Sequence, residues 1–406
     1  MELAGGSRGG GHSMAGSVFR IDGYASLRDY AVIGDGRTAA LVARDGSVDW
    51  LALPDLHSPP IFAAVLDAFG GGNFCLEPEV AYRVTRRYVR GTNVLETTFI
   101  TDSGAVRVTD ALTLRDDATL SPARELLRRI DGVAGTVPMR WRVRPRFGYG
   151  GRRPRLSWRS GVPVAESAGS AAAVCSWDAG APRLNDGTVS GAFELRQGHR
   201  AMLAMLFADH EPLVLPGRGE CEARLEHTCT AWSQWTQARN YRGCWREAVL
   251  RSALALKLLV YAPSGAVAAA ATSSLPECIG GERNWDYRFS WIRDSAFTIA
   301  AFLQLGCSAE AHAYFWWLMH ASQLTHPRLR VLYRLDGGPV GREREWPLYG
   351  YRGSRPVRTG NAAAEQVQLD TYGELLQTGF LYANAVGRLD ADVARRLAQL
   401  ADFVCA

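Results

Sequence analysis

The spacing of hydrophobic residues changes once along this chain, near residue 229, and the change divides it into two parts. From about residue 24 to 225, apolar residues come in short alternating runs separated by turns rich in Gly, Asn and Asp. Beyond that point they recur at the three- and four-residue spacing of α-helices. A length of 406 residues also exceeds one ordinary domain. We therefore expect a β region followed by an α region.

The first part predicts an antiparallel β-sandwich. Its apolar runs 41–43 and 48–51 flank Arg44-Asp45-Gly46-Ser47, a sequence typical of a hairpin turn. Evenly spaced short strands with such turns are characteristic of sandwiches. Three more strands are expected at residues 82–89, 94–100 and 105–112.

The strand expected at 139–147 has the clearest alternation. Its odd-numbered residues are apolar, so one face of the strand is expected to be buried and the other basic. The basic face is either a solvated outer surface, which is the simpler interpretation, or a surface that binds polyanions. Its arginines are Arg140, Arg142, Arg144 and Arg146.

The second part predicts a series of apolar helices with no strand between them, an arrangement typical of helical hairpins. The last helix keeps its apolar face to the final residues, with no Gly, Asn or Pro stop signal. Five such helices do not close a ring, so we expect the chain to stop within a domain. The predicted helices span residues 245–261, 295–305, 308–323, 364–386 and 390 to the end.

Composition narrows the class of protein. The net charge is +5 with the arginines scattered, so no nucleic-acid partner is expected. No apolar run approaches the roughly 20 residues of a membrane span. The first nineteen residues are rich in Gly and Ser without an apolar segment, which predicts a flexible segment and no signal peptide. Eight cysteines without a CxxC pair favour a reduced, cytoplasmic protein.

Cofactor and metal motifs are weak. Residues 34–39 fit GxGxxA, but the hairpin turn at 44–47 leaves no room for the helix that a dinucleotide site needs. His312 and His320 lie two turns apart on one predicted helix, without the spacing of a metal site. We therefore expect neither cofactor nor metal, and interpret both histidines as core or edge residues.

Residues 275–295 form the densest cluster of charged and aromatic side chains, at the entrance to an apolar helix. Charges in such a place are costly unless they are paired or used. Arg293 offers planar donors and Asp294 offers acceptors, a combination suited to sugar hydroxyls. In the alternative interpretation, Asp294 caps the helix and Arg293 pairs with Asp286. Residue types alone do not decide between them.

Three blocks of sequence resemble one known family. The run GGERNWDYRFSWIRD at 280–294 closely resembles the signature of bacterial glycoside hydrolase family 15, whose members are glucoamylase-like and trehalase-like enzymes. GSRPVRTGN at 353–361 with QVQLDTYGE at 366–374 matches the second block, and segments between Asp29 and Pro54 match the first. In this order the blocks cover most of residues 20 to 390.

The resemblance implies a multidomain β + α protein, with an N-terminal antiparallel β-sandwich followed by an (α/α)6 toroid of twelve helices. Here the toroid is expected to be incomplete. The expected divisions are a flexible segment at 1–19, the sandwich at 20–228, and about five toroid helices at 229–406. Family members release glucose from α-glucosides with inversion, using one glutamate as acid and another as base.

The resemblance also implies site residues. Arg293 and Asp294 match the segment that grips the non-reducing glucose, beside aromatic residues at Tyr287 and Trp291; Arg358 and Asn361 fall in a second loop lining the pocket. The family's Trp-Glu motif for the acid is absent, and no carboxylate in this chain matches a catalytic position. The acid and base are therefore expected beyond Ala406, with no catalytic residue in this chain.

Two functions stay open. The leading one is an inverting hydrolase of trehalose or malto-oligosaccharides, with the catalytic half absent from this chain; the N-terminal blocks lean towards the trehalase-like members. The alternative is a non-catalytic carbohydrate-binding protein or a degenerate remnant. Neither predicts a nucleic-acid or membrane partner, and exposed toroid helices predict self-association.

Overall fold

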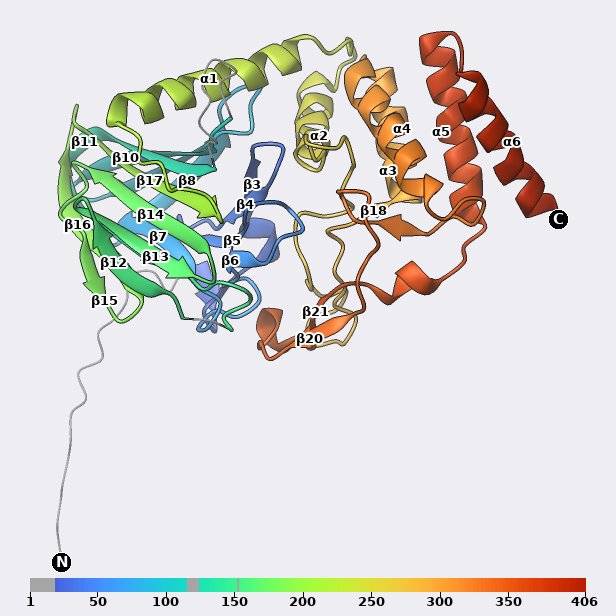
Figure 1. Ribbon diagram of the computed structural model, residues 1–406. Coiled ribbons are helices and arrows are strands. Elements are labelled where there is room, and N and C mark those ends of the chain that lie inside the picture. Colours follow the sequence, from blue (N-terminus) through green and yellow to red (C-terminus); the bar gives the residue numbers. More distant parts are fainter. Residues whose placement is uncertain (1–18, 115–123, 152) are drawn as a thin grey trace, which may run out of the picture.

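The computed structural model describes residues 19–114, 124–151 and 153–406 (Figure 1). The segment predicted to be flexible, residues 1–19, lies outside the described residues apart from Phe19. Strands dominate the chain up to Asp209, and helices dominate from Arg218 onwards. In Figure 1 the strands lie on the left and most of the helices on the right. The predicted β + α architecture is confirmed.

The first part consists almost entirely of strands, all paired antiparallel among the described residues. They are β1 (Arg20–Ile21), β2 (Tyr24–Ala25), β3 (Ala31–Gly34), β4 (Ala39–Val42), β5 (Val48–Ala52), β6 (Pro60–Phe62), β7 (Asn73–Pro78), β8 (Arg83–Tyr88), β9 (Leu95–Thr101), β10 (Gly104–Leu112), β11 (Glu125–Arg144), β12 (Arg155–Arg159), β13 (Val162–Ser167), β14 (Ser170–Trp177), β15 (Arg183–Asn185), β16 (Thr188–Arg196) and β17 (Arg200–Asp209).

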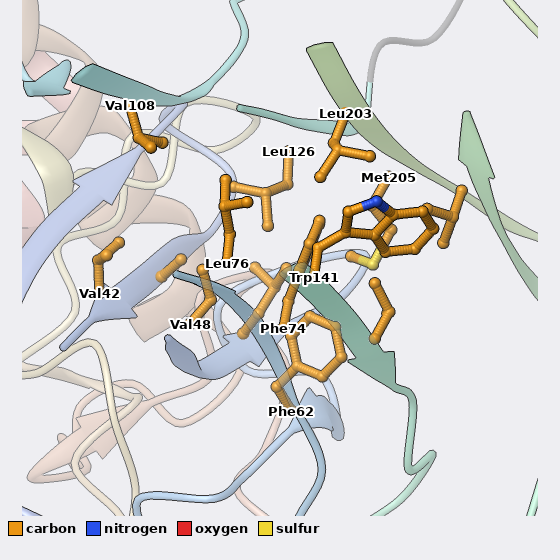
Figure 2. Packing of buried hydrophobic residues seen from close by; sticks show 14 of the residues in the cluster. Val42, Val48, Phe62, Phe74, Leu76, Val108, Leu126, Trp141, Leu203 and Met205 are labelled. Atoms are coloured by element: carbon orange, nitrogen blue, oxygen red, sulfur yellow. The ribbon is translucent and has the colours of Figure 1, made fainter. Parts of the chain in front are cut away.

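Strand β11 joins the two halves of a 15-stranded sheet. Its first half, 125–131, pairs with β10 and β17, whereas its second half, 136–144, pairs with β7 and β16. Apolar side chains from both halves meet in one core. Figure 2 shows Phe74, Leu76 and Trp141 close to Leu126 and Leu203, and all are almost fully buried. The halves therefore pack face to face, as a sandwich requires.

The individual strand predictions are largely confirmed. The hairpin predicted around Gly46 is β4 and β5, and Gly46 has the positive φ, 81°, that its turn requires. In the second half of β11, Met139, Trp141 and Val143 are buried, so the apolar face of the predicted alternation is the inner one.

Six helices follow. The predicted five correspond to the last five of them, with ends shifted by at most six residues. Their bounds are α1 (Arg218–Gln237), α2 (Arg246–Leu258), α3 (Ile292–Gln304), α4 (Ser308–Gln323), α5 (Asp370–Val386) and α6 (Ala391–Cys405). Helix α3 contacts α4 and α5, and α5 also contacts α4 and α6.

Two expectations were wrong. The β pattern does not continue to about residue 225, because α1 begins at Arg218. Its buried residues have helical spacing, but two of them are threonines, so the apolar period is hard to see; they are Cys221, Leu225, Thr228, Trp232 and Thr236. Strands also lie between the helices: β18 (Ser290–Trp291) pairs with β19 (Leu332–Tyr333), and β20 (Arg344–Trp346) with β21 (Val357–Thr359). Strands of two or three residues are too short to show alternation.

The helical part is bonded to the sheet by buried polar contacts. The Tyr24 hydroxyl donates to the Gly350 carbonyl at 3.1 Å, and the Tyr351 hydroxyl donates to the Ala25 carbonyl at 3.0 Å. Trp50 donates through Nε1 to the Ala271 carbonyl at 3.0 Å. These bonds hold the loops that precede α3 and α5 against the β part.

All eight cysteines lie within the described residues, and each is a free thiol. None of the described helices has both the length and the apolar character needed to cross a membrane. His312 lies within 2.7 Å of the Tyr382 hydroxyl, which gives it a polar partner on α5.

Candidate substrate-binding site

The segment that leads into α3 presents two different faces. Asn284, Asp286 and Arg288 are buried, whereas the intervening Tyr287 is 36% exposed. This alternation follows from an extended backbone, in which successive side chains point to opposite sides. One face of the segment is therefore an anchor and the other is open to a ligand.

The anchoring face is built on an ion pair between Arg288 and Asp286. The guanidinium donates to both carboxylate oxygens at 2.8 Å, and its third donor reaches the Ser58 carbonyl of the β part at 2.7 Å. Both side chains are almost fully buried. Burial opposes the charge of Arg288, but the negative charge of Asp286 outweighs it and holds the pKa of Arg288 above its ordinary value. The pair thus ties the segment to the sheet.

The open face carries the exposed ring of Tyr287, which lies against the almost fully buried ring of Trp291. Tyr287 and Trp291 lie with ring centroids 5.4 Å apart, tilted by 51°. Trp291 rests on a small apolar cluster that includes Phe289 and Val331, which fixes its ring. Burial, followed by the negative charges of Glu277 and Asp294, raises the pKa of Tyr287, so its hydroxyl stays protonated and able to donate. The two rings expected in the site therefore lie together as one aromatic wall, in which Tyr287 is the exposed ring and Trp291, 6% exposed, is the ring behind it.

Arg293 and Asp294 occupy the first turn of α3 and touch each other. Arg293 donates to Asp294 at 3.2 Å and to Asp370 of α5 at 3.3 Å. Both side chains are close to half-exposed, so donors and acceptors are available to a ligand. The alternative in which Asp294 caps the helix is wrong, because the N-cap position is Trp291 and no side chain caps it.

The alternative pairing of Arg293 with Asp286 is also wrong, since Arg288 is the partner of Asp286. Arg293 instead reaches back to its neighbour Asp294, and Asp370 of α5 contacts the other side of the same guanidinium.

Arg358 and Asn361 approach the segment from the second loop. Arg358 lies over the Trp285 ring at 4.6 Å, and its Nε is 2.9 Å from Glu343. Asn361 is buried; its amide donates to the Asp286 carbonyl at 3.2 Å and its oxygen accepts from the Ala363 amide at 3.0 Å. The structure therefore brings the two loops together, with Asn361 placed to hold the backbone of the first loop.

A cavity of about 590 Å³ lies beside this second loop, a size suited to a sugar-sized ligand. Asn361 lines it, together with Glu343 and Gln366. The other five predicted site residues do not line it, so the structure does not bring all six predicted residues to one cavity. Within the described residues, no group of three His, Cys, Asp or Glu residues is arranged to hold a metal ion.

Two of the residues that shape the site were not predicted to do so. Arg288 belongs to the motif at 280–294, but no role was predicted for it. Its spacing of two residues from Asp286 would have placed both side chains on one face of an extended segment. Asp370 lies 77 residues from its partner Arg293, and nothing local in the sequence indicates that contact.

Comparison with known proteins supplies the context for this arrangement. The profile described as "Glycosyl hydrolases family 15" matches residues 243–406, and the profile "Trehalase-like, N-terminal" matches residues 23–172. The helical part of the chain is thus similar to glycosyl hydrolases family 15, and the β part is similar to the trehalase-like N-terminal profile. The resemblance carried by the three sequence blocks is thereby confirmed.

Three trehalases illustrate the similarity. That of Thermoplasma volcanium is 33% identical over 375 residues, which cover 91% of this chain and 59% of that protein. That of Mycolicibacterium smegmatis is 35% identical, covering 89% and 58%. Trehalase 1 of Sulfolobus acidocaldarius is 32% identical, covering 88% and 60%. The chain therefore spans about three fifths of the length of these curated relatives.

Proposed function

We propose that this chain carries the sugar-binding part of an inverting glycoside hydrolase that releases glucose from α-glucosides, with trehalose rather than malto-oligosaccharides as the substrate. The family match supports the reaction class, and the relatives named trehalase support the choice of substrate. As part of the same proposal, strands β1 to β17 form the sandwich domain, and α2 to α6 belong to an (α/α)6 toroid.

This proposal rests on the position of Arg293 and Asp294, which share the first turn of α3 directly after Trp291 of the aromatic wall. Trp291 is the N-cap residue of α3, and its ring lies 5.4 Å from the Tyr287 ring. A glucose unit needs directional partners for its hydroxyls and a flat apolar surface for its ring. The guanidinium supplies donors, the carboxylate supplies acceptors, and the aromatic rings supply the surface. Arg358 and Asn361 complete the proposed site by holding the loop that carries the wall.

Catalysis needs more than this surface. An inverting hydrolase uses two carboxylates roughly 6.5–9.5 Å apart, one protonated as the acid and one free as the base. The carboxylates that touch the proposed site residues from outside the set are Asp286, Glu343, Glu345 and Asp370, and each lies within 3.8 Å of an arginine. We therefore assign no described carboxylate as the acid or the base. The expected behaviour of this chain is binding of glucose units without hydrolysis of trehalose.

The test is a pair of measurements on the 406-residue chain: glucose release from trehalose and maltose, and calorimetric binding of both sugars. Asp294→Ala should weaken binding at least about tenfold, because it removes a charge-assisted acceptor worth roughly 1.5–3 kcal/mol. Asp392→Ala is the matched control, since Asp392 lies in the first turn of α6 and pairs with Arg395. Equal binding by both variants would refute the assigned site. Turnover that Asp370→Asn abolishes would show that a described carboxylate is catalytic.

A further inference from the structure

A second concave surface lies on the β part, outside the proposed sugar site. It is a groove of about 770 Å³ across the outer face of the sheet where β7, β11 and β16 run side by side. One wall comes from the β1–β2 hairpin and the loop that carries Phe69. Five arginines but only three carboxylates line it.

The register of the strands explains why the arginines converge. Arg142 of β11 is opposite Ser190 of β16, and Ser190 is opposite Arg183 of β15, so all three point to one face. Adjacent strands are ~4.8 Å apart, so Arg142 and Arg183 start roughly 10 Å apart with a serine between them. Arg144 is two residues along β11 and lies on the same face.

Small side chains form the floor between these arginines. Cys75 is opposite Arg142 and Asn73 is opposite Arg144 on β7, while Ala192 is opposite Arg140 on β16. Because none of these reaches far above the sheet, the long guanidinium groups surround a hollow instead of covering a flat face.

The charges in the groove are unevenly matched. Two of the three carboxylates are neutralised by ion pairs, Asp45 by Arg20 at 2.5 Å and Glu77 by Arg140 at 2.7 Å. The third carboxylate, Asp22, is exposed at the rim of the groove. Arg142, Arg144 and Arg183 have no carboxylate partner among the described residues. Burial, and then the positive charge of Arg142, lowers the pKa of Arg144. Like charges held together in this way destabilise the protein unless an anion joins them.

We propose that this groove binds a small anionic sugar, a saccharide bearing an oxyanion group such as a carboxylate, sulfate or phosphate. The guanidinium groups of Arg142, Arg144 and Arg183 bind the oxyanion through charge-assisted hydrogen bonds, as arginine forks do. Phe69, which is 74% exposed at the wall, provides an apolar surface for the sugar ring.

Size decides between this ligand and a polyanionic chain. The volume lies within the 300–1,000 Å³ typical of small-molecule sites. A nucleic-acid or polysaccharide chain instead needs a basic track along the surface. Asp22, which is exposed at the rim and has no ion pair among the described residues, would repel the negative charges of such a chain. A merely solvated face would need neither the hollow nor the concentration of unpaired arginines.

The experiment is calorimetric binding of glucuronate, glucose 6-sulfate and glucose 6-phosphate to the full chain, with glucose and inorganic sulfate as comparison ligands. At least one anionic sugar should bind about tenfold or more tighter than either comparison ligand. Arg142→Gln with Arg183→Gln should reduce that affinity at least about tenfold, because two charge-assisted contacts are lost. Arg155→Gln, an exposed arginine on β12 without an ion pair among the described residues, should leave the affinity unchanged.

Three results would overturn the proposal: no anionic sugar binds at millimolar concentration, inorganic sulfate binds as tightly as the sugars, or the Arg155→Gln variant loses as much affinity as the double variant. Trehalose binding is measured on the same double variant and should be unchanged, which separates this test from the proposed sugar site near α3. If the double variant fails to fold, Phe69→Ala provides the second test, since its exposed ring is not needed for the core; it should weaken binding of the anionic sugar at least threefold.

Discussion

Removing the charge of Asp286 should destabilise the protein strongly and loosen the proposed sugar site at the same time. Asp286→Asn keeps the shape of the side chain but leaves the Arg288 guanidinium buried without a counter-charge. Breaking a buried ion pair in this way typically costs about 3–5 kcal/mol. Two hydrogen bonds of 2.8 Å to the carboxylate and near-complete burial place this pair in that class.

The chain supplies a matched control. Arg334 and Asp336 form the same kind of pair, two residues apart and 2.7 Å from each other, but both side chains are more than 40% exposed. Asp336→Asn should therefore cost only about 0–1 kcal/mol. A double replacement, Asp286→Leu with Arg288→Met, removes both charges and should recover most of the stability lost in the single variant, since apolar substitutes for a buried pair are often close to neutral.

The assay is urea unfolding followed by tryptophan fluorescence, combined with trehalose binding in the folded range. The ion pair anchors the backbone that carries Tyr287 and whose Asp286 carbonyl accepts a hydrogen bond from Asn361, so the double variant should stay folded but bind the sugar more weakly. A loss below 1 kcal/mol for Asp286→Asn, or a double variant no more stable than the single one, would refute the anchoring role.

Two further predictions concern the helices. Burial opposes ionisation of Glu310, but Lys257 at 2.8 Å and Trp235 at 2.7 Å outweigh it and hold the pKa of Glu310 below its ordinary 4.5. Its contribution is therefore complete above about pH 4.5 and lost as pH falls through the lower folded value. Glu310→Gln should cost about 1–3 kcal/mol at pH 7 and flatten the decline below pH 4.5 in unfolding measured from pH 3 to 7. Leu369 and Phe380 of the α5 region are largely exposed, so the chain should self-associate in light scattering, and Phe380→Lys should shift it towards monomer; a monodisperse unmodified chain would contradict this.

The sequence indicated the fold where the apolar period was strong and local. Helices α2 to α6 and the hairpin of β4 and β5 bury residues whose spacing is visible in the chain, so their positions could be predicted. Helix α1 could not, because its buried face mixes Thr228 and Thr236 with apolar residues. The path of the sheet through β11 also could not be predicted, since it depends on pairings between segments more than sixty residues apart.

The candidate site divides in the same way. Residue types and the motif located the loop, and the ring contact of Tyr287 with Trp291 followed from their closeness in sequence. The partners of the charged residues did not follow. The sequence suggested Asp286 as the partner of Arg293, whereas the structure pairs Arg293 with its neighbour Asp294 and, because α3 packs against α5, with Asp370.

This outcome follows from how an extended segment shares its residues between stability and binding. In the run from Asn284 to Arg288, every second side chain is buried. The two charged residues of the run, Asp286 and Arg288, therefore pair with each other, and Arg288 also donates to a backbone carbonyl of the β part. The chain then becomes helical at α3, where side chains no longer alternate between two faces. The next charged residues, Arg293 and Asp294, lie in the first turn of this helix with their side chains close to half-exposed. A charged residue in such a motif is therefore a candidate for contacting substrate only if the local backbone conformation leaves its side chain exposed. By that criterion, Asp294→Ala should alter sugar binding more than stability, and Asp286→Asn should alter stability first.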